Sequence, residues 1–214
     1  MEASARPGAA GVEPTAGETA RARPTVSPVA DPGPLGLAAF ALTTFVLSMF
    51  NAGFMGAGGE PVVFGLALAY GGLAQLLAGM WEFRTGNTFG ATAFTSYGAF
   101  WLSFWAFEQF YAKDVPKADL GHAVGLYLIA WGIFTAYMFV ASLRTTGAIA
   151  LVFLLLAITF ILLGIGDAGT HPNITKVGGY VGLATAAAAW YASFAAVANS
   201  TFGRTVMPVR SLAR

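Results

Sequence analysis

Polar side chains recur at helical spacing inside the apolar runs of this sequence, and they are the residues that could do chemistry. In the first run, Phe40, Thr44, Leu47 and Asn51 follow one another at spacings of four, three and four, so they share one side of a helix. Gln75 lies in the middle of the second run. An amide inside an apolar span needs a hydrogen-bond partner or water. Such groups therefore either hold helices together or line a polar path.

Two interpretations of the first run stay open. Asn51 could cap the outer end of the helix, while Thr43 and Thr44 bond back to their own backbone. Alternatively, the face that carries these side chains lines a path. Gln75 is flanked by Gly71 and Gly79, where another helix can approach closely, so both interpretations bury it in the bundle.

No catalytic constellation is found in the sequence. His122 and His171 fall in or beside predicted loops, and no H-E-x-x-H, G-x-S-x-G or phosphate-loop motif occurs. The absence of cysteine excludes disulfides, thiolate catalysis and zinc–sulfur sites. Glu82 lies near Arg84 at the end of the second run, where either an interfacial ion pair or a role at the mouth of a path would explain it. The sequence predicts no enzyme, no metal site and no cofactor.

The elements that must position these residues are membrane helices. The chain is 57% hydrophobic and only 10% charged, far from the balance of a soluble protein. A net charge of +1 argues against nucleic acid as a partner, because no basic stripe is present to neutralise phosphates. We therefore expect an all-α polytopic membrane protein whose six helices bundle around a central path. The first span begins at Leu35 and continues for about twenty residues. The other five cover 62–81, 91–110, 123–143, 148–166 and 177–199.

Outside the spans, composition predicts two tails. Residues 1–30 contain no aromatic residue and are expected to form a disordered tail rather than a cleaved signal peptide. The helical domain covers 31–200, and 201–214 form a C-terminal tail. Six spans leave both tails on one side. That side carries eight Lys and Arg against three on the other, so both termini are predicted to be cytoplasmic, in a cell membrane.

Four blocks of the sequence resemble the acetate uptake transporter family, which includes bacterial succinate-acetate permeases and fungal acetate and ammonia relatives. They are DPGPLGLAAF (31–40), YGGLAQLLAGMWEFRTGNTFGATAFTSYGAFW (70–101), GLYLIAWGIFTAYMF (125–139) and FGRTVMP (202–208). The resemblance covers nearly everything from Asp31 to Pro208. Asp31 and Gly33 stand where the family usually has Asn and Ala.

The resemblance implies a six-helix protomer that assembles into a homohexamer in the lipid bilayer. Each protomer would carry its own path for acetate and similar small carboxylates, and in some members for succinate. The narrowest part of that path would be formed by Phe40, Tyr97 and Leu156. Polar residues expected to line the path are Thr44, Asn51, Gln75 and Thr95, and those expected at its cytoplasmic mouth are Asp31, Glu82 and Asn87.

Elementary energetics favour passage of the acid together with a proton. Neutralising a carboxylate of pKa about 4.3 at pH 7 costs roughly 4 kcal/mol, whereas taking the dry anion into an apolar constriction costs several kcal/mol or more. Channel-like and proton-coupled transport both stay open. An alternative is a channel for ammonia, urea or water, favoured by the lack of a buried cation to hold a carboxylate. A receptor or structural protein would give no reason to bury Asn51 and Gln75.

Overall fold

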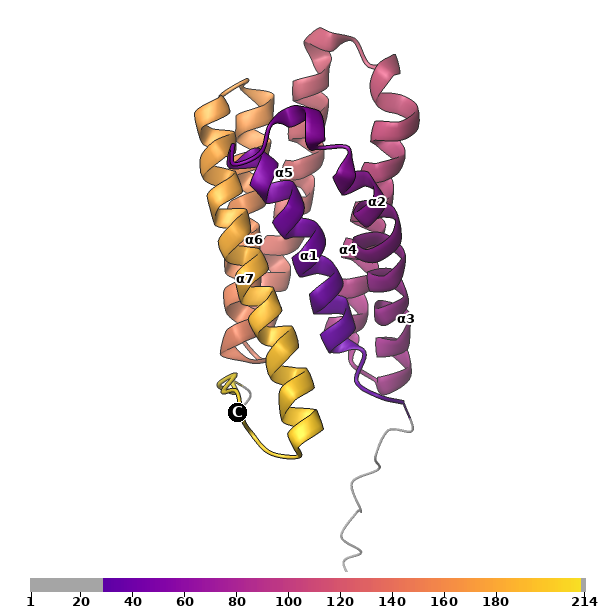
Figure 1. The fold of residues 1–214 in the computed structure, drawn as a ribbon, viewed down its shortest axis with the longest axis vertical. Helices are drawn as coiled ribbons and strands as arrows, with labels where there is room; N and C mark the ends of the chain where they lie inside the picture. The colour runs from indigo at the N-terminus through magenta and orange to yellow at the C-terminus, as the bar shows by residue number, and fades with distance from the viewer. Residues whose placement is uncertain (1–28, 213–214) are drawn as a thin grey trace, which may run out of the picture.

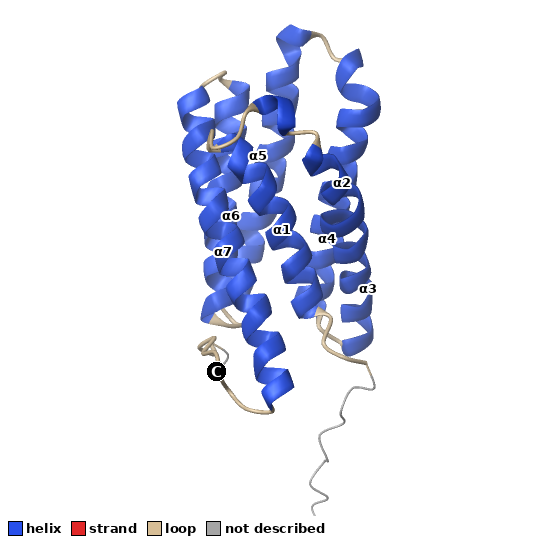
Figure 2. Ribbon diagram, viewed as in Figure 1, coloured by secondary structure: helices blue, strands red, loops and turns tan. Residues whose placement is uncertain are grey.

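The computed structural model describes residues 29–212, and within them it is a bundle of long helices without any β-strand (Figures 1 and 2). The described chain begins and ends at the same end of the bundle, called the lower end here (Figure 1). The predicted tail 1–30 lies outside the described residues except for its last two positions. An all-α membrane-type bundle, as the sequence predicts, is confirmed.

Six long helical segments make up the bundle. The second is continuous from α2 through the π-helical turn η2 into α3, and the third ends in another π-helical turn, η3. Short 3-10 turns precede α2 (η1, Ala57–Gly59) and α5 (η4, Ala112–Asp114). The bounds are α1 Gly33–Asn51, α2 Val62–Leu68, η2 Ala69–Ala74, α3 Gln75–Thr85, α4 Thr88–Ala106, η3 Phe107–Tyr111, α5 Lys117–Ser142, α6 Gly147–Ala168 and α7 Pro172–Phe202.

Five of these segments, within the part of the chain that the structure describes, are long and apolar enough to cross a membrane. The remaining one, α4, is as long as α1, with 19 residues each, but carries several Thr and Ser residues. It packs along α3 and α2 inside the bundle. Six long segments therefore match the predicted number, while a membrane crossing by α4 stays a prediction.

Several predicted loops are wrong, because the helices continue beyond the apolar runs. The predicted loop 167–176 shrinks to three residues, since α6 ends at Ala168 and α7 begins at Pro172. The predicted connection 111–122 is mostly helical too, with α5 starting directly after Pro116. Pro116 is the N-cap residue, where its missing N–H interrupts no helical hydrogen bond. At the other end of the chain, α7 continues to Phe202, past the predicted start of the tail at 201.

Close helix contacts follow the small residues, as the sequence predicts. A Cβ added at Gly79 of α3 would overlap the backbone nitrogen of Thr95 on α4, and one at Gly182 of α7 would overlap the Ser48 hydroxyl on α1. Small residues let membrane helices approach to backbone contact. A Cβ at Gly71 of η2 would likewise overlap the Thr43 side chain on α1. Helix α1 therefore lies between α7 and the α2–α3 segment (Figure 1).

Candidate functional site

The three residues of the predicted constriction are buried in one apolar cluster. Phe40 on α1, Tyr97 on α4 and Leu156 on α6 are only 4%, 3% and 4% exposed. The rings of Phe40 and Tyr97 lie 5.9 Å apart between centroids and are tilted by 50°. Three helices distant in sequence thus bring these side chains into one buried cluster.

The hydroxyl of Tyr97 belongs to a hydrogen-bonded chain that ends on α5. It lies 2.9 Å from the Thr135 hydroxyl, which donates its own hydrogen to the Trp131 carbonyl at 2.7 Å. Since a hydroxyl has one hydrogen, Tyr97 must be the donor to Thr135. Phe134 packs edge-on against the Tyr97 ring, and Phe153 lies on another side.

Thr135 was missed by sequence reasoning, and so was the aromatic surround of Tyr97. The available signal was Thr135 itself, which is the one threonine in the predicted span 123–143 and is fully buried in the structure. Its partner on another helix was not visible, because the two residues are 38 positions apart.

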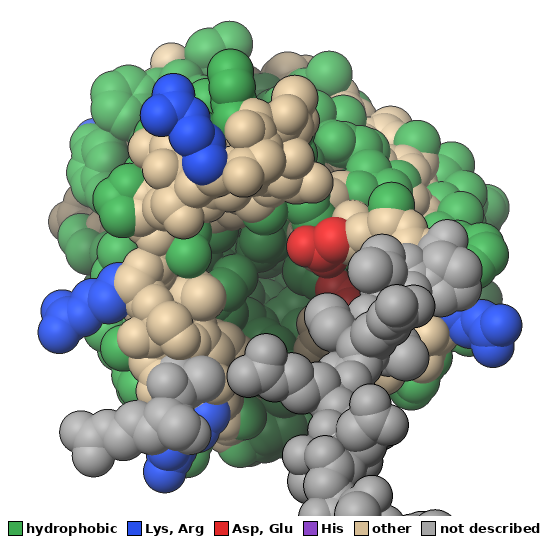
Figure 3. Space-filling view, turned by 90° about the horizontal axis from the view of Figure 1, so that it is seen from below, with side chains coloured by type: hydrophobic (Ala, Val, Ile, Leu, Met, Phe, Trp, Pro, Cys, Tyr) green, Lys and Arg blue, Asp and Glu red, His purple; other side chains and the backbone are tan. Residues whose placement is uncertain are grey.

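Below the cluster, a cavity of about 320 Å³ opens toward the lower end. We call it the lower cavity. Leu37 and Phe94, which lie one turn below Phe40 and Tyr97 on their helices, line its inner end, next to the cluster. Figure 3 shows the hollow from below, with acidic side chains beside green apolar walls. All three residues predicted for the mouth of the path line this cavity, namely Asp31, Glu82 and Asn87. Residues that were not predicted line it as well, among them Ile149, Asn199 and Val209.

Glu82 is held by neighbouring polar groups rather than by the expected arginine. It is 2% exposed, and its carboxylate accepts a hydrogen bond from the Thr85 hydroxyl at 3.1 Å. The Asn87 side chain is a second donor to it. Asn87 also accepts from the Gly90 amide at 3.0 Å, which caps α4. The predicted pairing of Glu82 with Arg84 is therefore replaced by hydrogen bonds to the α3–α4 turn.

Asp31 lies just before the start of α1. Its carboxylate accepts a hydrogen bond from the Gly33 amide at 2.8 Å. A Cβ placed on Gly33 would lie 3.0 Å from an Asp31 oxygen and 3.4 Å from a Glu82 oxygen. The two carboxylates therefore face each other across Gly33 at the rim of the lower cavity.

A second cavity of about 640 Å³, the upper cavity, opens at the opposite end of the bundle. Asn51, the last residue of α1, lines it and is half-buried rather than buried. The loop residue His171 lines it as well, beside Glu60, Lys117 and Asp167. Along α1 the order is Leu37 in the lower cavity, Phe40 in the cluster and Asn51 in the upper cavity. The buried cluster thus separates two openings.

Buried polar atoms near this cluster lack partners among the described protein groups. They are Thr44 Oγ1, Gln75 Oε1, Thr95 Oγ1 and Trp101 Nε1. Thr43, in contrast, donates to the Ala39 carbonyl at 3.0 Å. Thr43 therefore bonds to its own helix, as the first interpretation of this span expects for both threonines, whereas Thr44 does not. Buried polar groups without a partner are costly, so these atoms are available to water or a small polar solute.

Comparison with known proteins finds relatives in fungi and bacteria, several of which are named as transporters. Acetate permease A of Emericella nidulans is 46% identical over 195 residues, which make up 84% of this chain and 65% of that protein. Two Saccharomyces cerevisiae proteins, accumulation of dyads protein 2 and ammonia transport outward protein 2, are 49% and 46% identical over 175 residues, 79% of this chain and 62% of each. The chain thus spans less than two thirds of these fungal relatives.

The bacterial relative matches over nearly its whole length. The succinate-acetate/proton symporter SatP of Escherichia coli is 39% identical over 181 residues, covering 85% of this chain and 95% of that protein. A solved structure of the bacterial acetate channel SatP aligns with a TM-score of 0.79 at 39% identity, over 85% of this chain and 99% of the other. The model of the GPR1/FUN34/yaaH family matches residues 15–214. The chain belongs to the GPR1/FUN34/yaaH family.

Proposed function

We propose that this protein conducts acetate and similar short carboxylic acids across a membrane. The observation that carries the proposal is the alignment of two cavities, at opposite ends of the bundle, with a buried cluster between them. The names of the relatives, acetate permease, succinate-acetate symporter and acetate channel, support the substrate class. Whether succinate is also carried depends on the width of the cluster.

In this proposal, Phe40, Tyr97 and Leu156 form the constriction. Two apolar walls and one phenol would select by size, because only a short acyl group fits between close-packed side chains. Because the Tyr97 hydroxyl donates its hydrogen bond to Thr135, its oxygen keeps lone pairs that can accept a hydrogen bond from the O–H of an undissociated acid. Thr44, Gln75 and Thr95 would orient the carboxyl group on either side.

The distribution of charge supports proton-linked passage. Helices α1 and α4 carry no charged side chain, and the charge on α6 is confined to Asp167 at its upper end. A carboxylate in the cluster would have no cation to pair with, and a dry unpaired charge is far more costly than a protonated acid. The acid therefore crosses with its proton, so that acetate flux is a proton flux as well.

A second candidate is a channel for small neutral solutes. The same lack of a cation favours it, and one fungal relative is named for ammonia transport. Ammonia and undissociated acetic acid share the need for a narrow, uncharged path with a few hydrogen-bonding groups. Competition between labelled acetate and ammonia or urea distinguishes the two candidates, since only a common path gives mutual inhibition.

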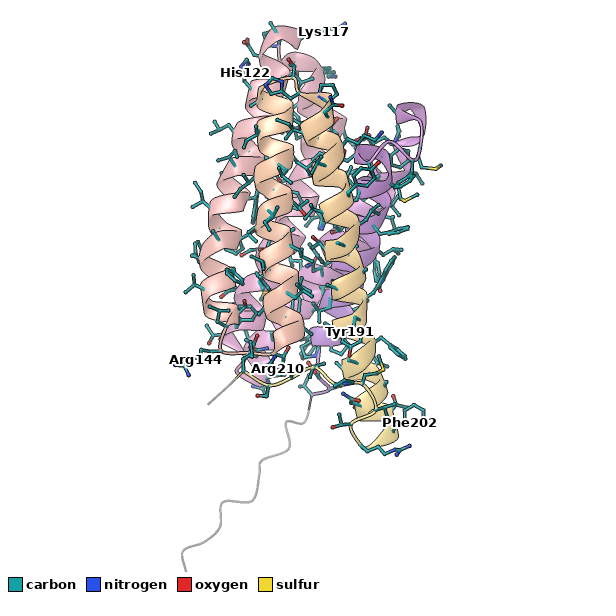
Figure 4. The ribbon with its side chains drawn as sticks, turned by 90° about the vertical axis from the view of Figure 1, so that its left-hand side faces the viewer. Lys117, His122, Arg144, Tyr191, Phe202 and Arg210 are labelled. Atoms are coloured by element: carbon teal, nitrogen blue, oxygen red, sulfur yellow. The ribbon has the colours of Figure 1, made fainter. Side chains whose placement is uncertain are left out.

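Assembly and orientation are proposed on the surface residues. Large apolar side chains cover the outer faces of α3 and α5, including Leu77, Met80, Leu126 and Ile133, which suits a bilayer and neighbouring protomers of a homohexamer. Arginines gather at the lower end and lysines at the upper end, as Arg144 and Lys117 show in Figure 4. The side of the two tails carries eight Lys and Arg against three on the other. Positive residues favour the cytoplasm, so the lower end, with both termini, faces inward in a cell membrane.

Labelled acetate uptake into proteoliposomes, with and without an inward proton gradient, tests the function. Leu156→Ala and Tyr97→Ala should change the rate or the acid-size preference. Leu126→Ala is the matched control, because Leu126 is 72% exposed on the outside of α5. No acetate flux above protein-free liposomes under any gradient would refute the substrate. Ammonia flux in the same vesicles would then establish the second candidate.

A further inference from the structure

The residues that follow α7 fold back across the lower end of the bundle. Helix α7 ends at Phe202, and Gly203 turns the chain with φ 63°, a left-handed conformation that glycine adopts without strain. The segment then climbs from Phe202 to the level of Arg144, where Figure 4 shows Arg210. We call residues 203–212 the C-terminal strap. The sequence predicted only a tail here.

One side chain holds the near half of the strap. The side-chain oxygen of Asn199 accepts hydrogen bonds from the backbone amides of Val206 at 2.7 Å and Met207 at 2.9 Å. Its side-chain nitrogen donates to the backbone carbonyl of Met207 at 2.9 Å. Tyr191, two turns earlier on α7, donates its hydroxyl to the Pro208 carbonyl at 2.6 Å.

The far half of the strap pairs with the turn between α5 and α6. The Gly147 amide donates to the Arg210 carbonyl at 2.8 Å, and the Leu212 amide donates to the Thr145 carbonyl at 2.9 Å. Between them, Thr146 and Ser211 form an antiparallel bridge. Arg210 adopts φ 49°, a left-handed conformation that is unfavourable for a residue with a Cβ.

The strap forms part of the wall of the lower cavity. Val209 lines it, and so do Asn199, Thr145 and Thr146, the residues that hold or flank the strap. Most strap residues are exposed, and only Met207, Val209 and Leu212 are half-buried. Its attachment therefore consists mainly of hydrogen bonds with which water can compete. Segments with few buried apolar contacts open at a small fraction of the global unfolding free energy.

We propose that the C-terminal strap is a movable cover over one side of the lower cavity, held in place by the side chain of Asn199, and that its displacement widens the access of solutes to the path. Asn199 acts here as a positioning residue through the strap. The effect on flux rests on the proposed function, whereas the effect on access to the cavity does not. The two parts are therefore tested by separate measurements.

Access is measured by thiol modification, because the chain has no cysteine of its own. Ala192→Cys places a single thiol in the lower cavity, where Ala192 lies 4% exposed, and a water-soluble trimethylammonium methanethiosulfonate is the probe. Adding Asn199→Ala should speed its modification at least fivefold. Adding Tyr191→Phe, which removes one of the four side-chain bonds to the strap, should speed it less.

The control thiol is Ala57→Cys, which lies in the upper cavity. Its modification rate should be the same with and without Asn199→Ala, which shows that the variant has not loosened the whole bundle. Equal rates for Ala192→Cys in the presence and absence of Asn199→Ala, within a factor of two, would overturn the cover. A parallel rise for Ala57→Cys would also overturn it, since general loosening would then explain the result.

A reversible lock tests the effect on flux. Directly opposed residues of an antiparallel bridge have Cα atoms about 4.5–5.5 Å apart, which suits a disulfide. Thr146→Cys with Ser211→Cys can therefore be oxidised and reduced in one preparation. Oxidation should slow acetate flux several-fold, and reduction should restore it; equal flux in both states would refute control by the strap. A parent protein without acetate flux would refute the substrate, while thiol modification still decides the cover.

Discussion

At the scale of single residues, the Tyr97 hydroxyl is the group whose removal is most informative. Its hydrogen is committed to Thr135, and the ring is fixed by Phe40, Phe134 and Phe153. Tyr97→Phe keeps the ring and removes only the oxygen. In the proposed function, the variant loses the hydrogen bond between the Tyr97 oxygen and the acid. One hydrogen bond is worth about 1 kcal/mol, which corresponds to about a fivefold change in rate.

We therefore expect Tyr97→Phe to lower acetate flux about fivefold and to lower the free energy of unfolding by about 1 kcal/mol. Flux in proteoliposomes and denaturant unfolding in detergent measure the two effects. Tyr180→Phe is the control, because Tyr180 is 44% exposed and should leave flux unchanged. An unchanged flux in Tyr97→Phe would remove the hydroxyl from the mechanism, whatever its effect on stability.

The family resemblance pointed to Tyr97 but not to its surroundings, for a physical reason. A periodic pattern reveals which side of a helix a residue occupies, and Phe40 and Thr44 were placed in that way. It does not reveal which residue of another helix lies opposite, because that depends on how the helices are turned about their axes. Thr135 was missed for this reason. Asn199 was missed because its partners, Val206 and Met207, lie in the irregular segment after α7, which has no periodic pattern.

At the scale of helices, the small residues decide how closely α3 and α4 approach. A Cβ at Gly79 would overlap the Thr95 backbone nitrogen, while one at Gly65 on α2 would meet nothing within 4 Å. Gly79→Ala should therefore destabilise the protein by about 1–3 kcal/mol through overpacking. Gly65→Ala should be neutral or stabilising by up to about 1 kcal/mol, from helix propensity.

Thermal unfolding in detergent, followed by circular dichroism, measures both glycine variants. The pair is matched, because each adds one methyl group to the same helical segment. Equal melting temperatures for the two variants would contradict the close α3–α4 contact. Since Thr95 carries one of the unpartnered hydroxyls, Gly79→Ala should also change acetate flux, and Gly65→Ala should not.

The helices themselves were predictable from apolar runs, and their ends were not. Hydropathy identifies the part of a helix that lies in lipid, but α6 and α7 extend past it into residues 167–176. Pro116 and Pro172 were the signals that would have shortened the loops 111–122 and 167–176, because proline is well suited to the start of a helix: Pro116 is the N-cap of α5 and Pro172 lies in the first turn of α7. The π-helical turn η2, which leads into Gln75, has no signal in the periodicity.

At the scale of the whole molecule, charge is arranged by end. Acidic residues line both cavities, at Asp31 and Glu82 below and at Glu60 and Asp167 above. The helices that carry Phe40 and Tyr97 have no charge between those ends. A permeating acid therefore meets water and charge at each mouth and an uncharged layer in the middle. Under the proposed function, this arrangement makes the protonation state of the solute, rather than that of the protein, the main determinant of flux.

The consequence is a defined pH dependence. Above the pKa of the acid, its undissociated fraction falls tenfold for each pH unit, which corresponds to about 1.36 kcal/mol. At constant total acetate and equal pH on both sides, we therefore expect exchange flux to fall nearly tenfold per unit between pH 6 and pH 8, roughly the range where the carboxylate dominates. Labelled acetate exchange in proteoliposomes measures it, after subtraction of the leak through protein-free liposomes.

Membrane potential distinguishes this mechanism from conduction of the anion. Potassium gradients with valinomycin set the potential while pH is held constant, and flux of the undissociated acid should not respond to it. Leu156→Ala should change the absolute flux and keep the same pH slope, because the slope comes from the solute. A flux that follows the potential and ignores pH would instead require the carboxylate to cross the uncharged layer, with Thr44, Gln75 and Thr95 replacing its hydration shell.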